Sequence, residues 1–119
     1  MAAVTAVSVG IGGAFGAVAR YLIGLAVDTR AADTLLVNVL GSLALGFLIG
    51  ADFDGTVMFA AGVGFCGAFT TFSSFAVETV RLAEDGHRSA AVSNAVGTVV
   101  AAVVAVSIGL TIGGIVAGG

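Results

Sequence analysis

The stretch GAFTTFSSF, residues 67–75, places four hydroxyl side chains and three phenyl rings inside the third of four long apolar runs. A loosened helix at membrane depth is tolerated only inside protein or beside a water-filled path. Hydroxyls can replace the backbone bonds that a break removes, and broken helices at this depth commonly expose carbonyls that hold cations. The alternative is an unbroken helix whose hydroxyls bond the carbonyls one turn earlier. The spacing favours the broken helix.

The composition of the whole chain is that of a membrane protein. Of its 119 residues, 59% are apolar and 9% are charged, whereas soluble domains carry about 25% charged residues. The mean hydropathy of +1.19 agrees with this. The net charge is −3 and lysine is absent, so nucleic acid is excluded as a partner because phosphate binding needs clustered Lys and Arg.

The four apolar runs each approach the roughly 20 residues that span a bilayer. We therefore predict an all-α, single-domain membrane protein covering residues 1–119. The expected spans are residues 3–27, 35–51, 56–82 and 89–116. Short polar connectors between them imply antiparallel neighbours. The first run has no basic segment before it and no convincing cleavage site, so we expect a retained helix.

Basic residues in the connectors predict the orientation. Arg30, Arg81 and Arg88 fall on one side, and the opposite connector has none. The positive-inside rule then places the first and third connectors in the cytoplasm, with both termini outside. The expected location is the cytoplasmic membrane, crossed several times.

Small residues recur four apart in three of the spans, which is the spacing that lets membrane helices approach closely. The pairs are Gly12 with Gly16, Gly46 with Gly50, and Gly109 with Gly113. Such pairs also occur by chance in glycine-rich spans. Cys66 lies in an apolar run, where a buried small apolar residue is expected. Because so small a chain encloses little space, conduction would need at least a dimer.

Several polar residues lie inside the spans and each has two interpretations. Arg20 either serves function or extends to the membrane interface. Asn38, followed by Ser42, can bridge helices or donate to an anion. Glu78 can pair with Arg81 or Arg20, or line a vestibule.

Asn94 and Thr98 lie four apart on one face of the fourth span. They form either a polar stripe along a pore or simple bonds between helices. Phe72 and Phe75 are packing residues or rings that present their positive edges to an anion.

No enzymatic constellation is present in the sequence. His87 is the sole histidine, which leaves neither a histidine metal site nor a histidine-based triad, so we predict a protein that is not an enzyme. A small multidrug transporter would need a carboxylate in the first span, and none precedes Asp28. An accessory membrane subunit would gain nothing from the polar cluster in the third span.

Three segments together resemble a known family. GAFTTFSSF with Glu78 is similar to the third-helix motif of the CrcB/Fluc fluoride channels. Residues 12–21, GGAFGAVARY, match its GGxxGAxxRY opening, and residues 38–42, NVLGS, match its NxxGS segment. The motifs occur in the right order and cover nearly the whole chain.

The resemblance implies an antiparallel dimer of inverted subunits with a broken third helix and two narrow pores that pass fluoride down its gradient. A structural Na⁺ would lie at the centre, held by backbone carbonyls of Gly67 and Thr70 from both subunits. The matching pore positions are Asn38, Thr71, Phe72, Ser74 and Phe75. Supporting polar positions are Arg20, Ser42, Glu78, Asn94 and Thr98.

Two features depart from the family. Its fourth helix usually carries a serine or threonine track, for which only Asn94 and Thr98 are candidates here. An inverted homodimer also needs balanced connectors, and the basic bias above opposes this. We therefore hypothesise that the chain inserts one way and pairs with an oppositely biased homologous subunit, as an alternative to the homodimer.

Overall fold

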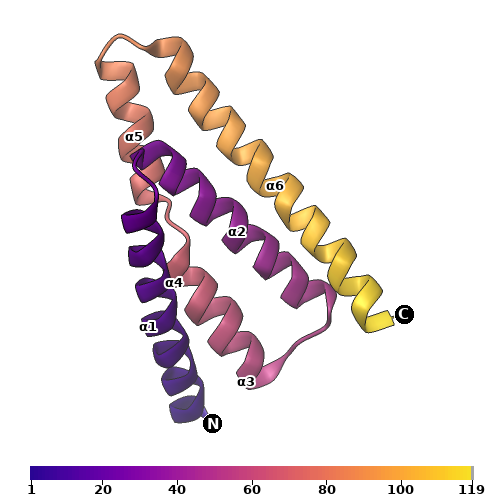
Figure 1. The fold of residues 1–119 in the computed structure, drawn as a ribbon. Coiled ribbons are helices and arrows are strands. Elements are labelled where there is room, and N and C mark those ends of the chain that lie inside the picture. The colour runs from indigo at the N-terminus through magenta and orange to yellow at the C-terminus, as the bar shows by residue number, and fades with distance from the viewer. Residues whose placement is uncertain (119) are drawn as a thin grey trace.

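The computed structural model describes residues 1–118, apart from the side chain at position 30, and these residues form helices joined by short connections (Figure 1). The elements are α1 (Ala2–Ala26), α2 (Arg30–Gly50), α3 (Gly55–Val57), η1 (Met58–Cys66), α4 (Gly67–Phe69), α5 (Ser73–Glu84) and α6 (Arg88–Gly118). The segments from α3 to α5 form one interrupted span, so four spans are long and apolar enough to cross a membrane. The expected all-α, four-span fold is confirmed.

The helix boundaries agree with expectation except at the second span. That helix begins at Arg30, earlier than the expected residue 35. Its first turn is closed by the Asp33 N–H, which donates to the Thr29 carbonyl at 2.9 Å. An acidic residue in the first turn is favourable because it lies at the positive end of the helix dipole. Residues 30–34, which were predicted to be part of the connector, therefore belong to the helix.

Neighbouring spans run in opposite directions, as the short connectors predicted. Both termini and the α2–α3 connection lie at one end of the molecule, and the α1–α2 and α5–α6 connections lie at the other (Figure 1). The tight α5–α6 turn places Gly86 at φ 84, a left-handed conformation that glycine adopts without steric cost.

The three glycine pairs all lie at close contacts between helices. Gly12 and Gly16 of α1 lie against the backbone carbonyls of Ala60 and Phe65 in the third span. Gly46 and Gly50 of α2 face Gly109 and Gly113 of α6, and each of these four glycines lies against a backbone carbonyl of the opposite helix. A Cβ atom would not fit at any of these positions, so glycine sets the helix spacing.

The third span is interrupted where the hydroxyl cluster predicted. Thr70 has φ −85 and ψ 164, an extended conformation that ends α4, and helical structure resumes at Ser73. The apolar segment before this break, Met58–Cys66, is π-helical, whereas an apolar run alone predicts an ordinary α-helix. π-helical turns are wider than α-helical turns, so residues 67–69 face a different direction from the one that the 3.6-residue period predicts.

Candidate ion pathway at the helix break

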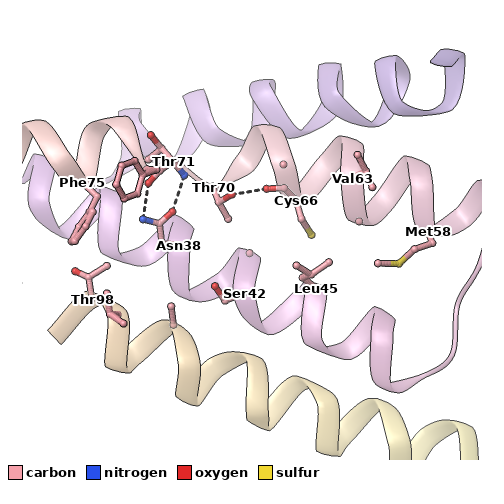
Figure 2. A pocket seen from close by; sticks show the side chains of 16 residues that line it. Asn38, Ser42, Leu45, Met58, Val63, Cys66, Thr70, Thr71, Phe75 and Thr98 are labelled. Atoms are coloured by element: carbon pink, nitrogen blue, oxygen red, sulfur yellow. Dashed lines mark hydrogen bonds between the residues drawn. The ribbon is translucent and has the colours of Figure 1, made fainter. Parts of the chain in front are cut away.

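The broken segment is held by one side chain from the neighbouring span. The Asn38 amide N–H donates to the Thr71 carbonyl at 2.9 Å, and the Asn38 amide oxygen accepts from the Thr71 N–H at 2.8 Å (Figure 2). Both backbone groups of Thr71 are thereby satisfied, as the bilayer interior requires. Asn38 bridges α2 to the break and keeps a second amide N–H for another acceptor.

The hydroxyls in the break act in two different ways. Thr70 Oγ1 donates to the Cys66 carbonyl at 2.8 Å, one turn earlier. Thr71 Oγ1 accepts from the Ser74 N–H at 3.2 Å and so serves as a cap for α5. The broken-helix prediction is therefore confirmed and the unbroken-helix alternative is wrong, although Thr70 does bond the carbonyl one turn earlier.

The break also removes the helical donors of two carbonyls. In a continuous helix the Gly67 carbonyl would accept from the Thr71 N–H, and the Thr70 carbonyl would accept from the Ser74 N–H. Here these N–H groups bond to Asn38 and to Thr71 Oγ1 instead. Two carbonyl oxygens close in sequence are thus available to an external ligand.

A pocket of about 510 Å³ opens beside the break, between α2, the third span and α6 (Figure 2). Apart from the Cys66 thiol, the described lining of this pocket contains no ionisable side chain. Its hydrogen-bonding side chains are Asn38, Ser42, Thr70, Thr71 and Thr98. Phe72 and Phe75 complete the wall, with ring centroids 5.8 Å apart and ring planes inclined at 53°. The pocket therefore offers neutral donors and ring edges.

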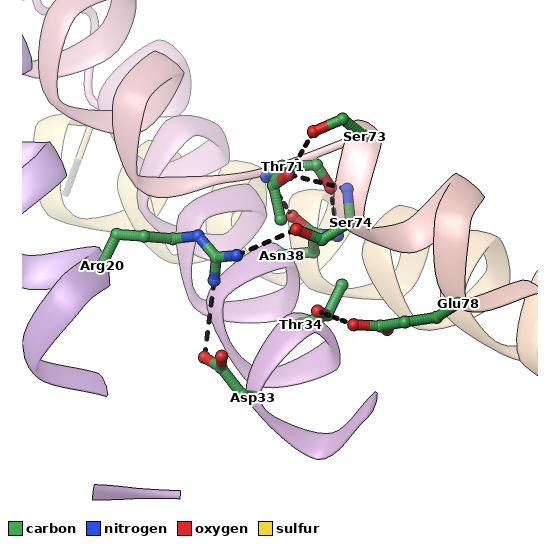
Figure 3. A network of polar contacts seen from close by, with 8 residues as sticks. All are labelled: Arg20, Asp33, Thr34, Asn38, Thr71, Ser73, Ser74 and Glu78. Atoms are coloured by element: carbon green, nitrogen blue, oxygen red, sulfur yellow. Dashed lines mark hydrogen bonds and ion pairs between the residues drawn. The ribbon is translucent and has the colours of Figure 1, made fainter. Parts of the chain in front are cut away.

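Glu78 lies outside this pocket. Its side chain is buried and lines a smaller pocket of about 140 Å³ with Ser73, Ser74 and Val77. Thr34 Oγ1 donates to Glu78 Oε2 at 2.8 Å, and the buried Glu78 Oε1 has no hydrogen-bond partner in the part of the chain that the structure describes (Figure 3). Among the described side chains, Glu78 is paired with neither Arg20 nor Arg81, so the ion-pair interpretation is wrong and the vestibule interpretation remains.

Arg20 is instead bonded to two other helices. One terminal nitrogen of its guanidinium lies 3.4 Å from Asp33 Oδ1 in α2, and the other donates to Ser74 Oγ in α5 at 3.2 Å (Figure 3). These bonds hold the side chain within the protein and disfavour the interpretation that it extends to the membrane interface.

Asn94 and Thr98 have separate environments despite sharing a helix face. Asn94 donates through Nδ2 to Thr79 Oγ1 in α5 at 2.9 Å, which is the interhelical interpretation. Thr98 is buried and lines the larger pocket, as the pore-stripe interpretation expects.

Three partner residues were missed in the sequence. Asp33, Thr34 and Thr79 bond to Arg20, Glu78 and Asn94 respectively. Asp33 and Thr34 fall in the segment that was predicted to be a connector, and nothing in the sequence distinguishes Thr79 from other hydroxyl residues in the helices. Only the packing of the helices brings each to its partner, so spacing along the chain gave no signal.

Comparison with known proteins places the chain in one family and among similar relatives that carry the same name. Residues 7–110 match the family described as CrcB-like protein, Camphor Resistance (CrcB). The chain is 70% identical over 96 residues to a protein of Natronomonas pharaonis named fluoride-specific ion channel FluC 2, covering 81% of this chain and 83% of that one. It is 50% identical over 91 residues to FluC 1 of Nocardia farcinica, covering 72% and 64%. It is 51% identical over 90 residues to FluC 2 of Haloarcula marismortui, covering 74% and 76%.

Proposed function

Because this chain belongs to the CrcB-like family, we propose that it is a fluoride-selective channel that lets fluoride leave the cell passively through the cytoplasmic membrane. Its similar relatives are named ion channels, which assigns the chain to transport proteins and not to enzymes. The observation that carries the proposal is the neutral, donor-lined pocket beside a broken membrane helix.

The chemistry of the pocket suits a small anion. Fluoride is strongly hydrated, so a narrow pore must replace its water with hydrogen-bond donors. The free amide N–H of Asn38 and the hydroxyls of Ser42 and Thr98 are such donors. The edges of Phe72 and Phe75 add positive potential without a full charge. Several moderate sites favour both entry and exit, which conduction requires.

The two carbonyls freed by the break support a structural Na⁺. Gly67 and Thr70 would hold it through their backbone oxygens, which hard cations prefer. One chain offers two such oxygens, so a second copy or a homologous subunit would supply the rest. When bound, the ion would add positive charge near the pore and join the two broken helices.

The partner subunit follows from the same reasoning. An inverted homodimer would bring two breaks together, whereas the basic bias of the connectors favours a homologous subunit of opposite orientation. Mapping the accessibility of single cysteines in intact cells tests this. One fixed orientation supports the heterodimer, and equal amounts of both orientations contradict it.

The decisive experiment is fluoride efflux from liposomes that contain the purified chain, read with a fluoride electrode and compared with chloride efflux. Wild-type protein is expected to release fluoride and retain chloride. Phe72→Ile is expected to reduce fluoride efflux at least about tenfold, because it removes a ring edge from the path. Phe15→Ile, at a ring 67% exposed on α1, is the matched control and should leave efflux unchanged.

A folded wild-type chain without efflux, alone and with a co-expressed homologue, would refute the proposed function. Efflux that appears only with the homologue would support the channel and the heterodimer together. Equal chloride and fluoride efflux would refute selectivity.

A further inference from the structure

The first turn of α2 sends two adjacent side chains to different helices. Thr34 reaches Glu78 in α5, while Asp33 lies 3.4 Å from the Arg20 guanidinium in α1. The other end of that guanidinium donates to the Ser74 hydroxyl at 3.2 Å. This Asp33–Arg20–Ser74 chain joins three helices directly beside the break (Figure 3).

Ser74 differs from most other bonded hydroxyls in the molecule. Six of them donate to the carbonyl four residues earlier, namely Thr5, Ser8, Thr70, Thr79, Ser107 and Thr111. Ser74 has no such bond within the described part of the chain, because the residue four positions earlier lies in the break. A guanidinium can only donate, so the Ser74 oxygen accepts from Arg20. The Ser74 proton therefore points away from Arg20 and remains available to another acceptor.

The charge of Arg20 is balanced where it stands. The Arg20 and Asp33 side chains are 24% and 14% exposed, so water screens the pair only partly. An unpaired guanidinium beside a pore would hold an anion too strongly for rapid exit. Paired with Asp33, the guanidinium still orients Ser74 but presents little net charge to a passing ion.

We propose that Asp33 sets the anion affinity of the channel by neutralising Arg20 while Arg20 directs the Ser74 hydroxyl proton toward the ion path. Asp33 is thus a positioning residue that acts through Arg20. This inference rests on the proposed function and adds to it that the ion path continues past Ser74, which lines the smaller pocket with Glu78.

The test is fluoride flux measured over a range of fluoride concentrations, which separates the half-saturating concentration from the maximal flux. Asp33→Asn leaves the positive charge unpaired, so the half-saturating concentration should fall about threefold or more and the maximal flux should fall with it. Arg20→Gln leaves the negative charge unpaired, so the half-saturating concentration should rise by a similar factor.

The double variant Arg20→Gln/Asp33→Asn separates the effect of charge from the orientation of Ser74. It removes both charges, so its half-saturating concentration should return to within about twofold of wild type. Its maximal flux should stay reduced, because Ser74 has lost the donor that orients it. Asp33→Glu keeps the charge and should retain the wild-type concentration dependence.

Asp85→Asn and Arg88→Gln are the matched controls. Both residues are exposed at the same end of the molecule, in and after the α5–α6 connection. Small effects of these exposed charges should vanish in a concentrated impermeant salt, while the effects at the partly buried pair should persist. Each variant is first checked for a single peak in size-exclusion chromatography.

Opposite shifts in the single variants with recovery in the double variant support the proposal. If both single variants shift the half-saturating concentration in the same direction, or the double variant adds their losses, the pair is only a structural tie and the proposal is wrong. Should Asp33→Asn misfold, a shifted concentration dependence in Asp33→Glu equally contradicts it. A wild-type chain that passes no fluoride refutes the proposed function itself, and this inference with it.

Discussion

The two halves of the third span are held in place by different forces. The half before the break, from α3 to α4, packs on α1 through glycines that touch backbone carbonyls. The half after it, α5, is held by bonds between side chains of different helices, including Thr34 with Glu78 and Asn94 with Thr79. Shape positions the first half, and polar pairing positions the second.

This difference follows from what a membrane offers each half. Apolar helices gain little hydrophobic free energy by associating in lipid, so the close approach of small residues must supply dispersion contacts. Beside an ion path the side chains must be polar, and each needs a partner. The break lies between the two halves, and Asn38 bonds to its backbone on both the donor and the acceptor side.

Asn38→Ala should destabilise the protein most, because it removes the bonds where the two halves of the third span meet. Both backbone groups of Thr71 lose their partner, which should cost about 4 kcal/mol of unfolding free energy in this apolar setting. Thermal unfolding in detergent measures the loss. Ser107→Ala, which removes an exposed hydroxyl bonded within its own helix, is the control. Equal stability of the two variants would show that Asn38 does not hold the break.

The packed half should be sensitive to volume rather than to polarity. Gly16→Ala places a methyl group against the Phe65 carbonyl, forcing α1 away from the third span at a cost of about 2 to 3 kcal/mol. Gly10→Ala on the same helix meets nothing within 4 Å and should be neutral or stabilising by up to about 1 kcal/mol. The difference between the variants in thermal unfolding tests the idea, and equal values would contradict glycine-set spacing.

Much of the packed half could be predicted from the sequence, because its signals are local. The lengths of the apolar runs predicted the four spans, and the spacing of Gly12 and Gly16 marked α1 as a candidate for a close contact, which the structure shows. The break was also predictable, since clustered hydroxyls at membrane depth are themselves the signal. The π-helix over Met58–Cys66 was not, because no residue pattern in that apolar run distinguishes it from an α-helix.

The polar half was predicted as a set of residues, but not with the partners that the structure shows. The sequence offered Arg81 or Arg20 as an ion-pair partner of Glu78, but the observed pairs, Arg20 with Asp33 and Glu78 with Thr34, depend on how three helices meet. Asp33 also lay in a segment expected to be a connector, so its place in the first turn of α2 could not be used. Which neighbour satisfies a buried polar group is a tertiary property.

Thr34→Val tests whether polar pairing holds α5 in place. It removes the hydrogen bond to Glu78 Oε2, and Glu78 Oε1 already has no partner within the described part of the chain. We expect a loss of about 2 kcal/mol in unfolding free energy. Thr111→Val, at an exposed hydroxyl bonded within its own helix, should cost far less. If Thr34→Val/Glu78→Gln is no more stable than Thr34→Val, the unpaired carboxyl is not the cause of the loss.

Asn94 and Thr98 share one face of α6 but should differ in role, one in stability and the other in conduction. Asn94→Ala removes a bond to Thr79 at 2.9 Å, and bonds of this kind between membrane helices contribute about 0.6 kcal/mol on average. It should therefore lower stability slightly and leave fluoride flux unchanged. Thr98→Val, one turn further along α6, removes a donor from the larger pocket and should do the reverse. If both variants reduce flux, the ion path runs along this face of α6 past both residues. Conduction would then extend along the length of α5, the polar half of the third span, which packs beside this face.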